Sequence, residues 1–401
     1  MTNWKEYKLS DLMQIKYGKD HKHLADGVFP LYGSGGIMRY VEKPLYSEAS
    51  ILIPRKGTLS NLFFLDKPFW SVDTMFYSII NKQLALPKYL YYTLKTFDLA
   101  SLNVGSAVPS LTTEVLNDVL VSVPDIDTQT AIAEILSSLD DKIELNNKIN
   151  QELENLAQTL FKQWFIDFEF PNENGEPYKS SGGEMVDSEL GEIPKGWKVE
   201  TFGDLCKVVN GYAFKSKDFQ ETGNNGILKI RNVNGSIVDI INTQFVASDV
   251  VKSVQEKFRV LSGHILIAMT GAEVGKIGIV PETNKNLWLN QRVGRFEPVL
   301  GNSIVFIFHL FNVLNFTQAV RNSAMGSAQP NISASGIEGL HCIIPDKNVI
   351  LKYSSINQDA YNLTLNHLGE NQELTNLRDT LLPKLISGEL EVSEALTQNT
   401  A

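Results

Sequence analysis

Two glycine-rich segments are the parts of the sequence that most resemble sites of chemistry. The segment from Gly271 to Ile277 is similar to a phosphate-binding loop, but only three residues separate its glycines and Ile277 stands where Ser or Thr would ligate magnesium. A tight turn between strands is the better interpretation. The segment from Tyr32 to Gly36 lacks the dinucleotide-binding spacing. Its glycines are expected to let the backbone approach a neighbouring strand or a DNA phosphate.

The sequence lacks the residue patterns of a self-sufficient enzyme. An amino-methyltransferase would need an Asn/Asp-Pro-Pro-aromatic tetrapeptide, and there is no Pro-Pro pair. No Ser/His/Asp or paired-carboxylate arrangement follows from the spacing. Cys206 and Cys342 cannot form a disulfide framework or a zinc site unaided, and His367 has no nearby His or Cys with which to share a metal. We therefore expect no catalytic residue, no metal site and no cofactor bound by this chain.

Basic and polar side chains offer a second kind of chemistry, the binding of nucleic acid. Lys and Arg contact phosphates, and Arg, Asn and Gln also bond to base edges. The candidates are Lys19, His21, Lys22, Ser34, Gly35, Arg55 and Lys56 in the first part of the chain, and Lys215, Lys217, Arg231, Asn232, Lys276, Gln291 and Arg292 further on. The expected base readers are Arg231, Asn232, Gln291 and Arg292. Each candidate is also an ordinary solvated side chain, and that alternative stays open.

The charge of the chain is segregated in a way that suits this interpretation. The net charge is −10, which by itself argues against a polyanion partner. However, residues 1–122 carry 13 Lys/Arg against 11 Asp/Glu and residues 197–343 carry 14 against 11, whereas residues 123–170 carry 3 against 10. Only the two slightly basic blocks are plausible DNA binders. The acidic segment, which includes Asp140 and Asp141, is either a solvated face or a surface for a protein partner.

An internal repeat organises the elements that must position these side chains. Trp4, Asp11 and Gly18 recur 193 residues later, and the segment Asn150–Leu153 recurs 221 residues later as Asn371–Leu374. The chain is therefore a tandem duplication whose second copy has 28 more residues (221 − 193) in its globular part. In these globular parts we predict strands at residues 49–53, 75–80, 263–268 and 276–280. A helix is predicted to begin at Pro87.

Each copy ends in a long helix with a 3-4 spacing of apolar residues, which is typical of a coiled coil. Asn146 and His367 occupy equivalent positions of this pattern, where polar residues fix the register of pairing. An antiparallel pair places the two blocks at opposite ends and leaves the linker a short gap to cross. The residues expected to pair the helices are Ile132, Ile135, Leu139, Ile149, Leu153, Leu156 and Leu160 in the first and Ile356, Leu363, Leu374, Leu377 and Leu381 in the second.

The predicted fold class is mixed α/β (α+β). We expect two pseudo-symmetric globular domains, separated by two long helices that form an antiparallel coiled coil. The expected segments are a first domain at 1–125, a helix at 126–170, a linker at 171–196, a second domain at 197–346, a helix at 347–387 and a flexible tail at 388–401.

Three segments carry a resemblance to a known family. They are Leu160–Phe170 (LFKQWFIDFEF), Asp187–Trp197 (DSELGEIPKGW) and Leu381–Leu390 (LLPKLISGEL). From Trp4 to about Leu390 the chain resembles the specificity (S) subunit of type I restriction–modification systems. The resemblance implies that each globular domain is a target-recognition domain that reads one half of a split site on double-stranded DNA, and that the helices set the spacing between the halves.

The resemblance also implies the partners of the chain. Two modification (M) subunits, which methylate adenine, are expected on the helices, and restriction (R) subunits complete a nuclease. S-adenosylmethionine, ATP and Mg are then expected on the partner subunits. The sequence has no apolar run of the roughly 20 residues that cross a bilayer, so a cytoplasmic location without a membrane is expected. A two-headed scaffold that binds proteins, with the coiled coil as its spacer, is the alternative function.

Overall fold

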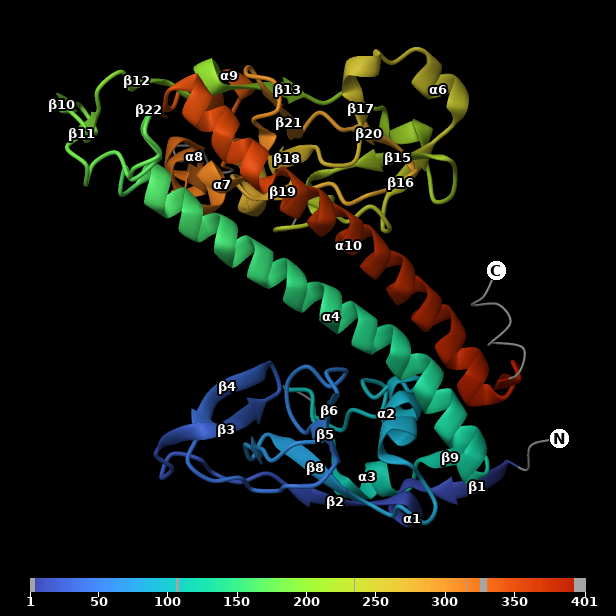
Figure 1. The fold of residues 1–401 in the computed structure, drawn as a ribbon. Coiled ribbons are helices and arrows are strands. Elements are labelled where there is room, and N and C mark those ends of the chain that lie inside the picture. The colour runs from blue at the N-terminus through green and yellow to red at the C-terminus, as the bar shows by residue number, and fades with distance from the viewer. Residues whose placement is uncertain (1–3, 106–107, 234, 315, 325–329, 393–401) are drawn as a thin grey trace. The chain divides into compact units, whose positions relative to one another are not determined.

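The computed structural model describes residues 4–105, 108–233, 235–314, 316–324 and 330–392 (Figure 1). The chain forms two compact units. Unit 1 comprises residues 1–142 and 374–401, and unit 2 comprises residues 143–373. The boundary crosses both long helices, α4 (Ile126–Phe165) and α10 (Lys347–Ser387). Each unit therefore contains one globular block together with a segment of each helix.

Unit 1 is built on a four-stranded antiparallel sheet in the order β2-β8-β5-β6, beside a three-stranded sheet in the order β4-β3-β7. A separate pair, β1 and β9, joins the two ends of the block. The strands are β1 (Lys5–Lys8), β2 (Met13–Tyr17), β3 (Asp26–Gly33), β4 (Gly36–Val41), β5 (Ser50–Pro54), β6 (Phe63–Leu65), β7 (Trp70–Ser71), β8 (Met75–Ile80) and β9 (Leu120–Val123). The short helices are α1 (Leu9–Leu12), α2 (Pro87–Lys95) and α3 (Thr113–Asn117).

Unit 2 repeats this plan with the sheets β13-β21-β18-β19 and β14-β16-β15-β20-β17, the pair β12 and β22 and an added hairpin, β10 and β11. The strands are β10 (Met185–Ser188), β11 (Gly191–Pro194), β12 (Lys198–Thr201), β13 (Cys206–Asn210), β14 (Phe219–Gln220), β15 (Asn225–Leu228), β16 (Gln244–Val246), β17 (Arg259–Val260), β18 (Ile265–Ala268), β19 (Ile277–Ile279), β20 (Asn286–Leu289), β21 (Val293–Pro298) and β22 (His341–Ile344). The helices are α5 (Phe202–Leu205), α6 (Ser248–Lys252), α7 (Ile304–Val313), α8 (Phe316–Ala324) and α9 (Ala334–Glu338), with 3-10 turns η1 (Ser216–Asp218), η2 (Ile230–Asn232), η3 (Glu256–Phe258) and η4 (Gly271–Glu273).

The duplication is visible in the pairing of the strands. Met13 pairs with Ile80 at one end of the unit 1 sheet, and Cys206 pairs with Pro298 at the matching place in unit 2. The offset between equivalent residues rises from 193 at Gly18 to 214 at Ile53, whose equivalent is Ile267. Most of the 28 extra residues therefore lie between β13 and β18. They enlarge the second sheet from three strands to five.

The strands expected from the sequence are present as β5, β8, β18 and β19, with ends that differ from the predicted ones by two residues or fewer. The predicted helix begins at Pro87 as α2. The segment from Gly271 to Ile277 is a turn, since it holds η4 between β18 and β19. The helix expected at 126–170 ends earlier, at Phe165. Phe168 has a left-handed backbone, with φ of 61°, which an α-helix cannot contain.

The two helices run antiparallel within each unit, as predicted. In unit 1 the start of α4 shares a core with the end of α10, where Leu136 and Leu385 are both fully buried. In unit 2 the end of α4 meets the start of α10, and the rings of Phe161 and Tyr353 lie 5.6 Å apart. The aromatic end of α4 also packs on the beginning of the second globular block, as expected. The ring centroids of Phe165 and Trp197 lie 6.0 Å apart.

The predicted pairing stripe is wrong at three positions. Leu156, Ile356 and Leu363 are exposed, at 69%, 55% and 40% of their surface. On α10 the buried residues of this region are Tyr361, Leu365 and others that belong to the core of unit 2. The globular block of unit 2 thus covers a face of α10 that helix pairing alone would leave exposed. The buried stripe of α10 therefore lies on a different side of the helix from the predicted one.

Three absences concern the described part of the chain. No single helix there is long and apolar enough to cross a membrane, and α7 and α8 reach such a length only as a bent pair. No group of three or more His, Cys, Asp or Glu is placed there to hold a metal ion. Cys206 and Cys342 are buried free thiols, and burial raises the pKa of Cys342 to about 12.

Candidate nucleic-acid interface

In unit 1, backbone hydrogen bonds tie four loop segments together beside the β2-β8-β5-β6 sheet. The N–H of Gly18 donates to the carbonyl of Met75 at 2.9 Å, and the N–H of Arg55 donates to that of Thr74 at 2.9 Å. The N–H of Gly57 donates to the carbonyl of Pro109 at 3.1 Å. We call residues 18–19, 55–57, 73–75 and 109–111 the loop frame of unit 1.

Unit 2 contains the same frame, formed by residues 211–212, 269–271, 291–293 and 330–332. The N–H of Gly211 donates to the carbonyl of Val293 at 3.2 Å, and that of Met269 to the carbonyl of Arg292 at 3.2 Å. The N–H of Gly271 donates to the carbonyl of Pro330 at 2.9 Å. Both frames are therefore held by the same set of backbone bonds.

The first glycine of each frame is required by the close approach of another loop. A Cβ atom on Gly18 would lie 2.1 Å from the carbonyl oxygen of Val72, and one on Gly211 would lie 2.2 Å from that of Asn290. Any side chain at these positions would force the loops apart. The duplication has thus kept the backbone of the frame, and the side chains that the frame presents are free to differ.

The frame of unit 1 presents three of the predicted basic residues. Lys19 and Lys56 are exposed. The guanidinium of Arg55 lies over the exposed ring of Tyr17, 5.2 Å from its centroid, and donates to the carbonyl of Asp73 at 3.1 Å. This contact with Tyr17 holds the cation in one place at the surface.

The turn between β3 and β4 joins this surface. Ser34 and Gly35 form the turn, and the side-chain amide of Asn61 donates to the carbonyl of Ser34 at 2.7 Å. A Cβ on Gly57 would lie 3.4 Å from the Ser34 hydroxyl oxygen. The turn of Ser34 and Gly35 therefore lies next to the loop that carries Lys56, although the two segments are distant in the sequence.

His21 and Lys22 lie in the loop between β2 and β3, which Arg39 holds in place. The guanidinium of Arg39 donates to the carbonyl of His21 at 2.8 Å and to that of Leu24 at 3.0 Å, and it pairs with Asp26 at 2.9 Å. Sequence reasoning missed Arg39. The only signal for it is a single charge among the apolar residues of a strand, which does not reveal its carbonyl partners.

In unit 2 the predicted residues Gln291 and Arg292 form the exposed turn before β21. The N–H of Gln291 donates to the carbonyl of Tyr212 at 3.0 Å, so the turn belongs to the loop frame. Lys215 and Lys217 are exposed at η1, a short distance along the chain from Tyr212. These four side chains are available to a ligand.

Arg231 and Asn232 are adjacent in η2 but have different environments. Arg231 is exposed, whereas Asn232 is buried. The Asn232 amide donates to the carbonyls of Asp239 and Asn242 at 2.9 and 3.2 Å and accepts from the N–H of Lys229 at 2.9 Å. The prediction that Asn232 reads a base is therefore wrong, because its hydrogen-bonding groups organise the loop that follows β15.

Two lysines of unit 2 are engaged within the protein. Lys276, a predicted contact, pairs with Glu273 at 2.5 Å and is only partly exposed, so it is a weaker candidate. The ammonium of Lys229 lies 3.4 Å from the centroid of the Phe219 ring and donates to Gln244 at 2.5 Å. Burial and the nearby charge of Arg231 lower the pKa of Lys229.

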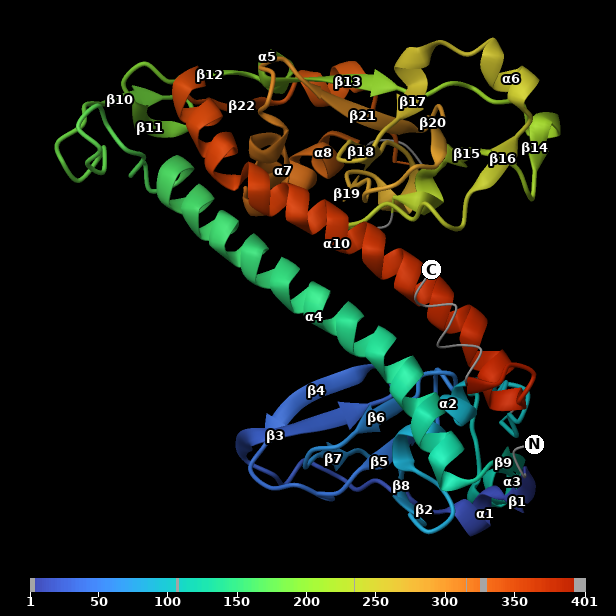
Figure 2. The same ribbon diagram turned by 45° about the vertical axis from the view of Figure 1, so that its right-hand side comes forward.

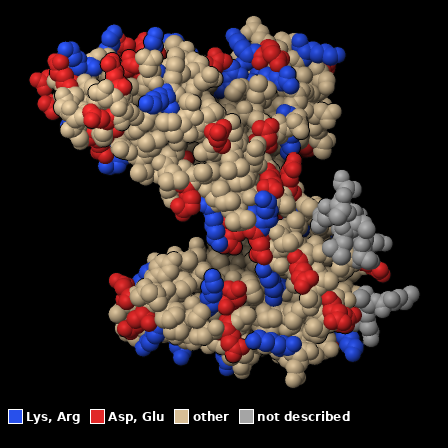
Figure 3. All heavy atoms as spheres, viewed as in Figure 1, with Lys and Arg blue, Asp and Glu red and all other residues tan. Residues whose placement is uncertain are grey.

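Figure 3 shows further Lys and Arg side chains gathered over α6 and β17 of unit 2, with acidic ones among them. The exposed members in this stretch are Lys252, Lys257 and Arg259. Arg259 pairs with Glu256 at 2.9 Å, so part of the positive charge is neutralised. Sequence reasoning did not single out these residues.

Comparison with known proteins assigns the two blocks to a family. The family model described as "Type I restriction modification DNA specificity domain" matches residues 1–155 and 194–376. The chain belongs to this family. Each matched range contains one globular block with its frame and the first part of the long helix that follows. We call the block in each range its specificity domain.

Similar proteins cover almost the whole chain. The MjaIX type I restriction enzyme specificity subunit of Methanocaldococcus jannaschii is 29% identical over 98% of this chain and 90% of its own length. The HindI specificity subunit of Haemophilus influenzae is 25% identical over 97% of this chain and all of its own length. The solved S subunit from M. genitalium shares the fold, with a TM-score of 0.62, 18% identity and 96% of each chain covered.

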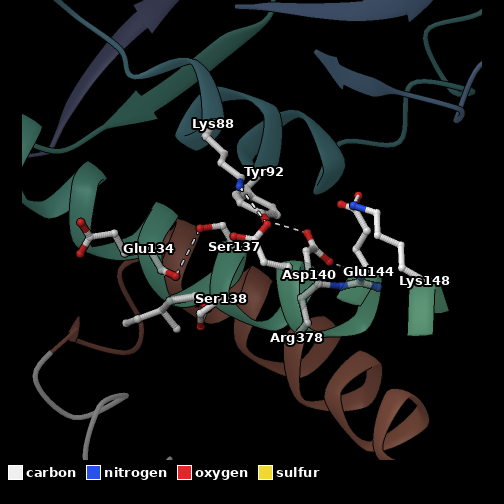
Figure 4. Close-up of polar contacts among 11 residues, drawn as sticks. Lys88, Tyr92, Glu134, Ser137, Ser138, Asp140, Glu144, Lys148 and Arg378 are labelled. Carbon is white, nitrogen blue, oxygen red and sulfur yellow. Dashed lines mark hydrogen bonds and ion pairs between the residues drawn. The ribbon is translucent and has the colours of Figure 1, made fainter. Parts of the chain in front are cut away.

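The specificity domain of unit 1 is fixed to both helices by Asp140 of α4 (Figure 4). This carboxylate accepts from the Tyr92 hydroxyl of α2 at 2.6 Å and from the Arg378 guanidinium of α10 at 2.6 Å. Burial and the hydrogen bond to Asp140 raise the pKa of Tyr92. Asp140, considered above as part of an acidic partner surface, is therefore a structural residue. Its neighbour Asp141 is exposed and pairs with Lys88 at 3.5 Å.

The specificity domain of unit 2 is fixed by a different group. The Tyr353 hydroxyl of α10 donates to the carbonyl of Ala157 at 2.9 Å and lies 2.8 Å from Nδ1 of His309, a residue of α7. Nε2 of His309 lies 3.5 Å from the Glu154 carboxylate of α4. Glu154 is thus a second acidic residue with an internal partner.

The predicted polar positions of the helices meet in unit 2. The Asn146 amide donates to Glu370 at 2.7 Å and to Asn371 at 2.9 Å, and Nδ1 of His367 lies 2.8 Å from the Asn150 side-chain oxygen. The duplication offset of 221 converts the pair Asn146–Asn371 into the pair His367–Asn150. The two pairs are thus equivalent by the duplication, and each joins α4 to α10. Polar bonds of this kind between paired helices suit a role in fixing the register.

Proposed function

We propose that the chain is the DNA sequence-specificity subunit of a type I restriction–modification complex. Each specificity domain reads one half of a bipartite site on double-stranded DNA. The observation that carries the proposal is the pair of loop frames, which share their backbone hydrogen bonds but present different side chains. Two surfaces of one shape and different chemistry suit two different short sequences. The names of the similar proteins support the same function.

The exposed basic residues divide into two roles. We assign phosphate contacts to Lys19, Lys22 and Lys56 in unit 1 and to Lys215 and Lys217 in unit 2, because a lysine ammonium neutralises phosphate without reading sequence. Base contacts are assigned to Arg231, Gln291 and Arg292, since Arg bonds to guanine and Gln to adenine in bidentate fashion. His21, Ser34, Gly35 and Arg55 adjoin the phosphate contacts of unit 1. Lys276 is kept as a contact only if its ion pair opens.

The remaining activities are assigned to partners. Two modification subunits bind along the helices and transfer methyl groups, and restriction subunits complete the nuclease. S-adenosylmethionine, ATP and Mg are bound by those subunits, and this chain is non-catalytic. The assembly acts on DNA in the cytoplasm.

The chain is divided between recognition and spacing. We propose that residues 1–125 and 197–346 are the two recognition domains and that α4 and α10 set the number of base pairs between the half-sites. Residues 171–196 form the linker, which contains the β10–β11 hairpin. A tail begins at Gly388, and residues 393–401 of that tail lie outside the described part of the chain.

The test is a map of methylated sites made with the chain assembled with its modification subunits. We expect two short half-sites separated by an unread spacer. Replacing Arg292 with Ala should relax the sequence preference in one half-site only, at a cost of about 1–3 kcal/mol for a lost bidentate contact. Lys198→Ala, at an exposed residue of β12 outside the frame, is the matched control.

Two results would contradict the proposal. A single contiguous target would exclude two independent readers. Unchanged DNA binding after charge reversal of both Lys56 and Arg292, together with loss of a bound protein, would instead indicate the two-headed scaffold.

A further inference from the structure

The β3–β4 hairpin of unit 1 exposes an unusual number of large apolar side chains. Ile37, Met38 and Tyr40 of β4 are each exposed by about half or more of their surface, and Val28 of β3 is exposed as well. Figures 1 and 2 show β3 and β4 side by side at the edge of unit 1 that lies away from β1 and β9. Contiguous apolar surface of this kind marks a place of interaction in a protein that is otherwise well packed.

The hairpin has one buried face and one outward face. Leu31 and Val41 are buried in the small core of unit 1. Other cross-strand pairs of the hairpin are Tyr32 with Ile37 and Pro30 with Tyr40. Ile37 and Tyr40 are exposed, whereas Tyr32 is half-buried, with its ring 5.5 Å from that of Phe63. Arg39 points away from the outward face toward the loop that it holds. The outward face therefore has aromatic and aliphatic groups and no charge of its own.

An irregularity in the hairpin exposes a further apolar residue, Met38, next to Ile37. The strand register shifts between Leu31 and Tyr32, which leaves Met38 as the extra residue of β4. The side chain of Met38 lies against Gly33, since a Cβ there would be 2.6 Å from the Met38 sulfur. A larger residue than Gly33 would displace it.

The tip of the hairpin is open. Gly36 has φ of 111°, which favours glycine, but Gly35 is not in the left-handed region. A Cβ on Gly35 would meet no atom within 4 Å. Neither backbone conformation nor packing within unit 1 requires a glycine at Gly35, so the space in front of it is available to a ligand.

The surroundings identify the ligand as a polyanion. Residues 15–61, which contain the hairpin and both adjoining loops, have seven Lys/Arg (16, 19, 22, 39, 43, 55 and 56) against four Asp/Glu (20, 26, 42 and 48). The exposed Lys56 precedes Gly57, which adjoins Ser34 at the tip of the hairpin, and the exposed Lys19 belongs to the loop frame. The uncharged face of the ribbon suits the base edges in a groove of DNA, and the cations beside it suit the phosphates that border the groove.

We infer that the outward face of the β3–β4 hairpin enters the major groove of the half-site read by unit 1 and contacts thymine methyl groups. The inference rests on the proposed function. A two-stranded ribbon fits the major groove, which is about 12 Å wide, and the thymine methyl is the apolar group displayed there. Ile37, Met38 and Tyr40 supply the contacts, and the lysines at the tip and frame hold the phosphates.

Unit 2 provides an internal contrast. None of the described residues in its strands β14 to β17 is an exposed large apolar side chain. The half-site read by unit 2 should therefore be insensitive to thymine methyls, whereas the one read by unit 1 should depend on them.

The experiment uses the chain assembled with its modification subunits and duplexes in which uracil replaces each thymine in turn. Uracil lacks the methyl group and keeps the base pair. We expect binding to weaken about fourfold for each buried methyl that is removed, and only in one half-site. Ile37→Ala and Met38→Ala should weaken binding to the thymine duplex and abolish the difference between thymine and uracil there. Leu120→Ala, at an exposed residue of β9 in the same unit, should keep the full difference.

Several outcomes would overturn the inference while leaving DNA recognition intact. These are sequence-specific methylation with no uracil effect in either half-site, a half-site pair without thymine in the half affected by the variants, or variants that lose affinity equally for both duplexes. Loss of the modification subunits from the hairpin variants would assign the face to a protein partner and also overturn it. Variants that keep their modification subunits and keep the sequence preference at the other half-site are folded. A wild-type complex that prefers no sequence would instead refute the proposed function.

Discussion

Unit 1 and unit 2 attach their specificity domains to the long helices with different chemistry, although both contain the same kind of four-stranded sheet and terminal strand pair. In unit 1 the attachment is ionic, since Asp140 joins Tyr92 and Arg378. In unit 2 it depends on the Tyr353 hydroxyl and on the pair of His309 and Glu154. Neither arrangement is copied by the duplication.

The apolar side of the same attachment shows what the duplication retained. Phe161, Trp164 and Phe165 of α4 are buried in unit 2. Their equivalents 221 residues later, Leu382, Leu385 and Ile386 of α10, are buried in unit 1. Burial and backbone geometry are therefore common to the units, while the type of side chain has diverged both here and on the loop frames.

The largest expected effect comes from emptying this apolar contact. Phe161→Ala removes a fully buried ring and should lower the free energy of unfolding of unit 2 by about 3–5 kcal/mol. Leu382→Ala is the equivalent change in unit 1 and should cost about 2–5 kcal/mol there. Hydrogen exchange, read by mass spectrometry along the full chain, reports the two units separately.

The comparison predicts that each variant loses protection in its own unit. Leu156→Ala, at an exposed position of the same helix, should change stability by less than about 0.5 kcal/mol and serves as the control. Equal loss of protection in both units after Phe161→Ala would show that the units do not unfold separately.

The framework of both units follows from the sequence because it depends on local patterns. The repeat, the 3-4 spacing and the short apolar runs each reflect burial of neighbouring residues, so α4, α10 and the main strands were predictable. The stripe on α10 was less so. Ile356 and Leu363 fit a coiled coil, but a globular block covers a neighbouring face, and a pattern along one helix contains no information about that block.

The candidate site was predictable in outline only. Exposure decides whether a polar residue is free for DNA, and Arg231 and Asn232 are neighbours with opposite exposure. Arg39 was missed because its partners are backbone carbonyls from another loop. The apolar hairpin face was missed since alternation along β4 indicates a strand but does not show that nothing covers its second face.

A smaller effect is expected from the ionic attachment of unit 1. Asp140→Asn keeps the shape of the side chain but removes the charge that faces Arg378, and it should destabilise unit 1 by about 1.5–3 kcal/mol. Asp141→Asn, the neighbouring change at an exposed ion pair with Lys88, should cost about 0–1 kcal/mol. Urea unfolding followed by hydrogen exchange in α2 distinguishes them. Similar losses for both variants would mean that the partly buried contact of Asp140 contributes no more than a surface ion pair.

The smallest expected effect is a pH dependence of the stability of unit 2, which comes from Glu154. Burial alone would raise the pKa of Glu154, but the hydrogen bond and charge of His309 lower it below its ordinary value of 4.5. Because the pKa is lower in the folded state, Glu154 stabilises unit 2 fully above pH 4.5, and this contribution is lost as the pH falls through the folded value. Glu154→Gln keeps a hydrogen-bonding side chain without the charge.

We therefore expect Glu154→Gln to be less stable than the wild-type chain near neutral pH, and the difference between the two to shrink in acid. Hydrogen exchange in α7, compared with exchange in α2 of unit 1 at each pH, measures this difference. Glu152→Gln, at an exposed residue of the same helix, is the control and should follow the wild type. A constant difference between wild type and Glu154→Gln at every pH would show that the carboxylate is held by shape and hydrogen bonding rather than by the charge of His309. The attachments of the two units would then differ in their dependence on an ion pair as well as in their residues.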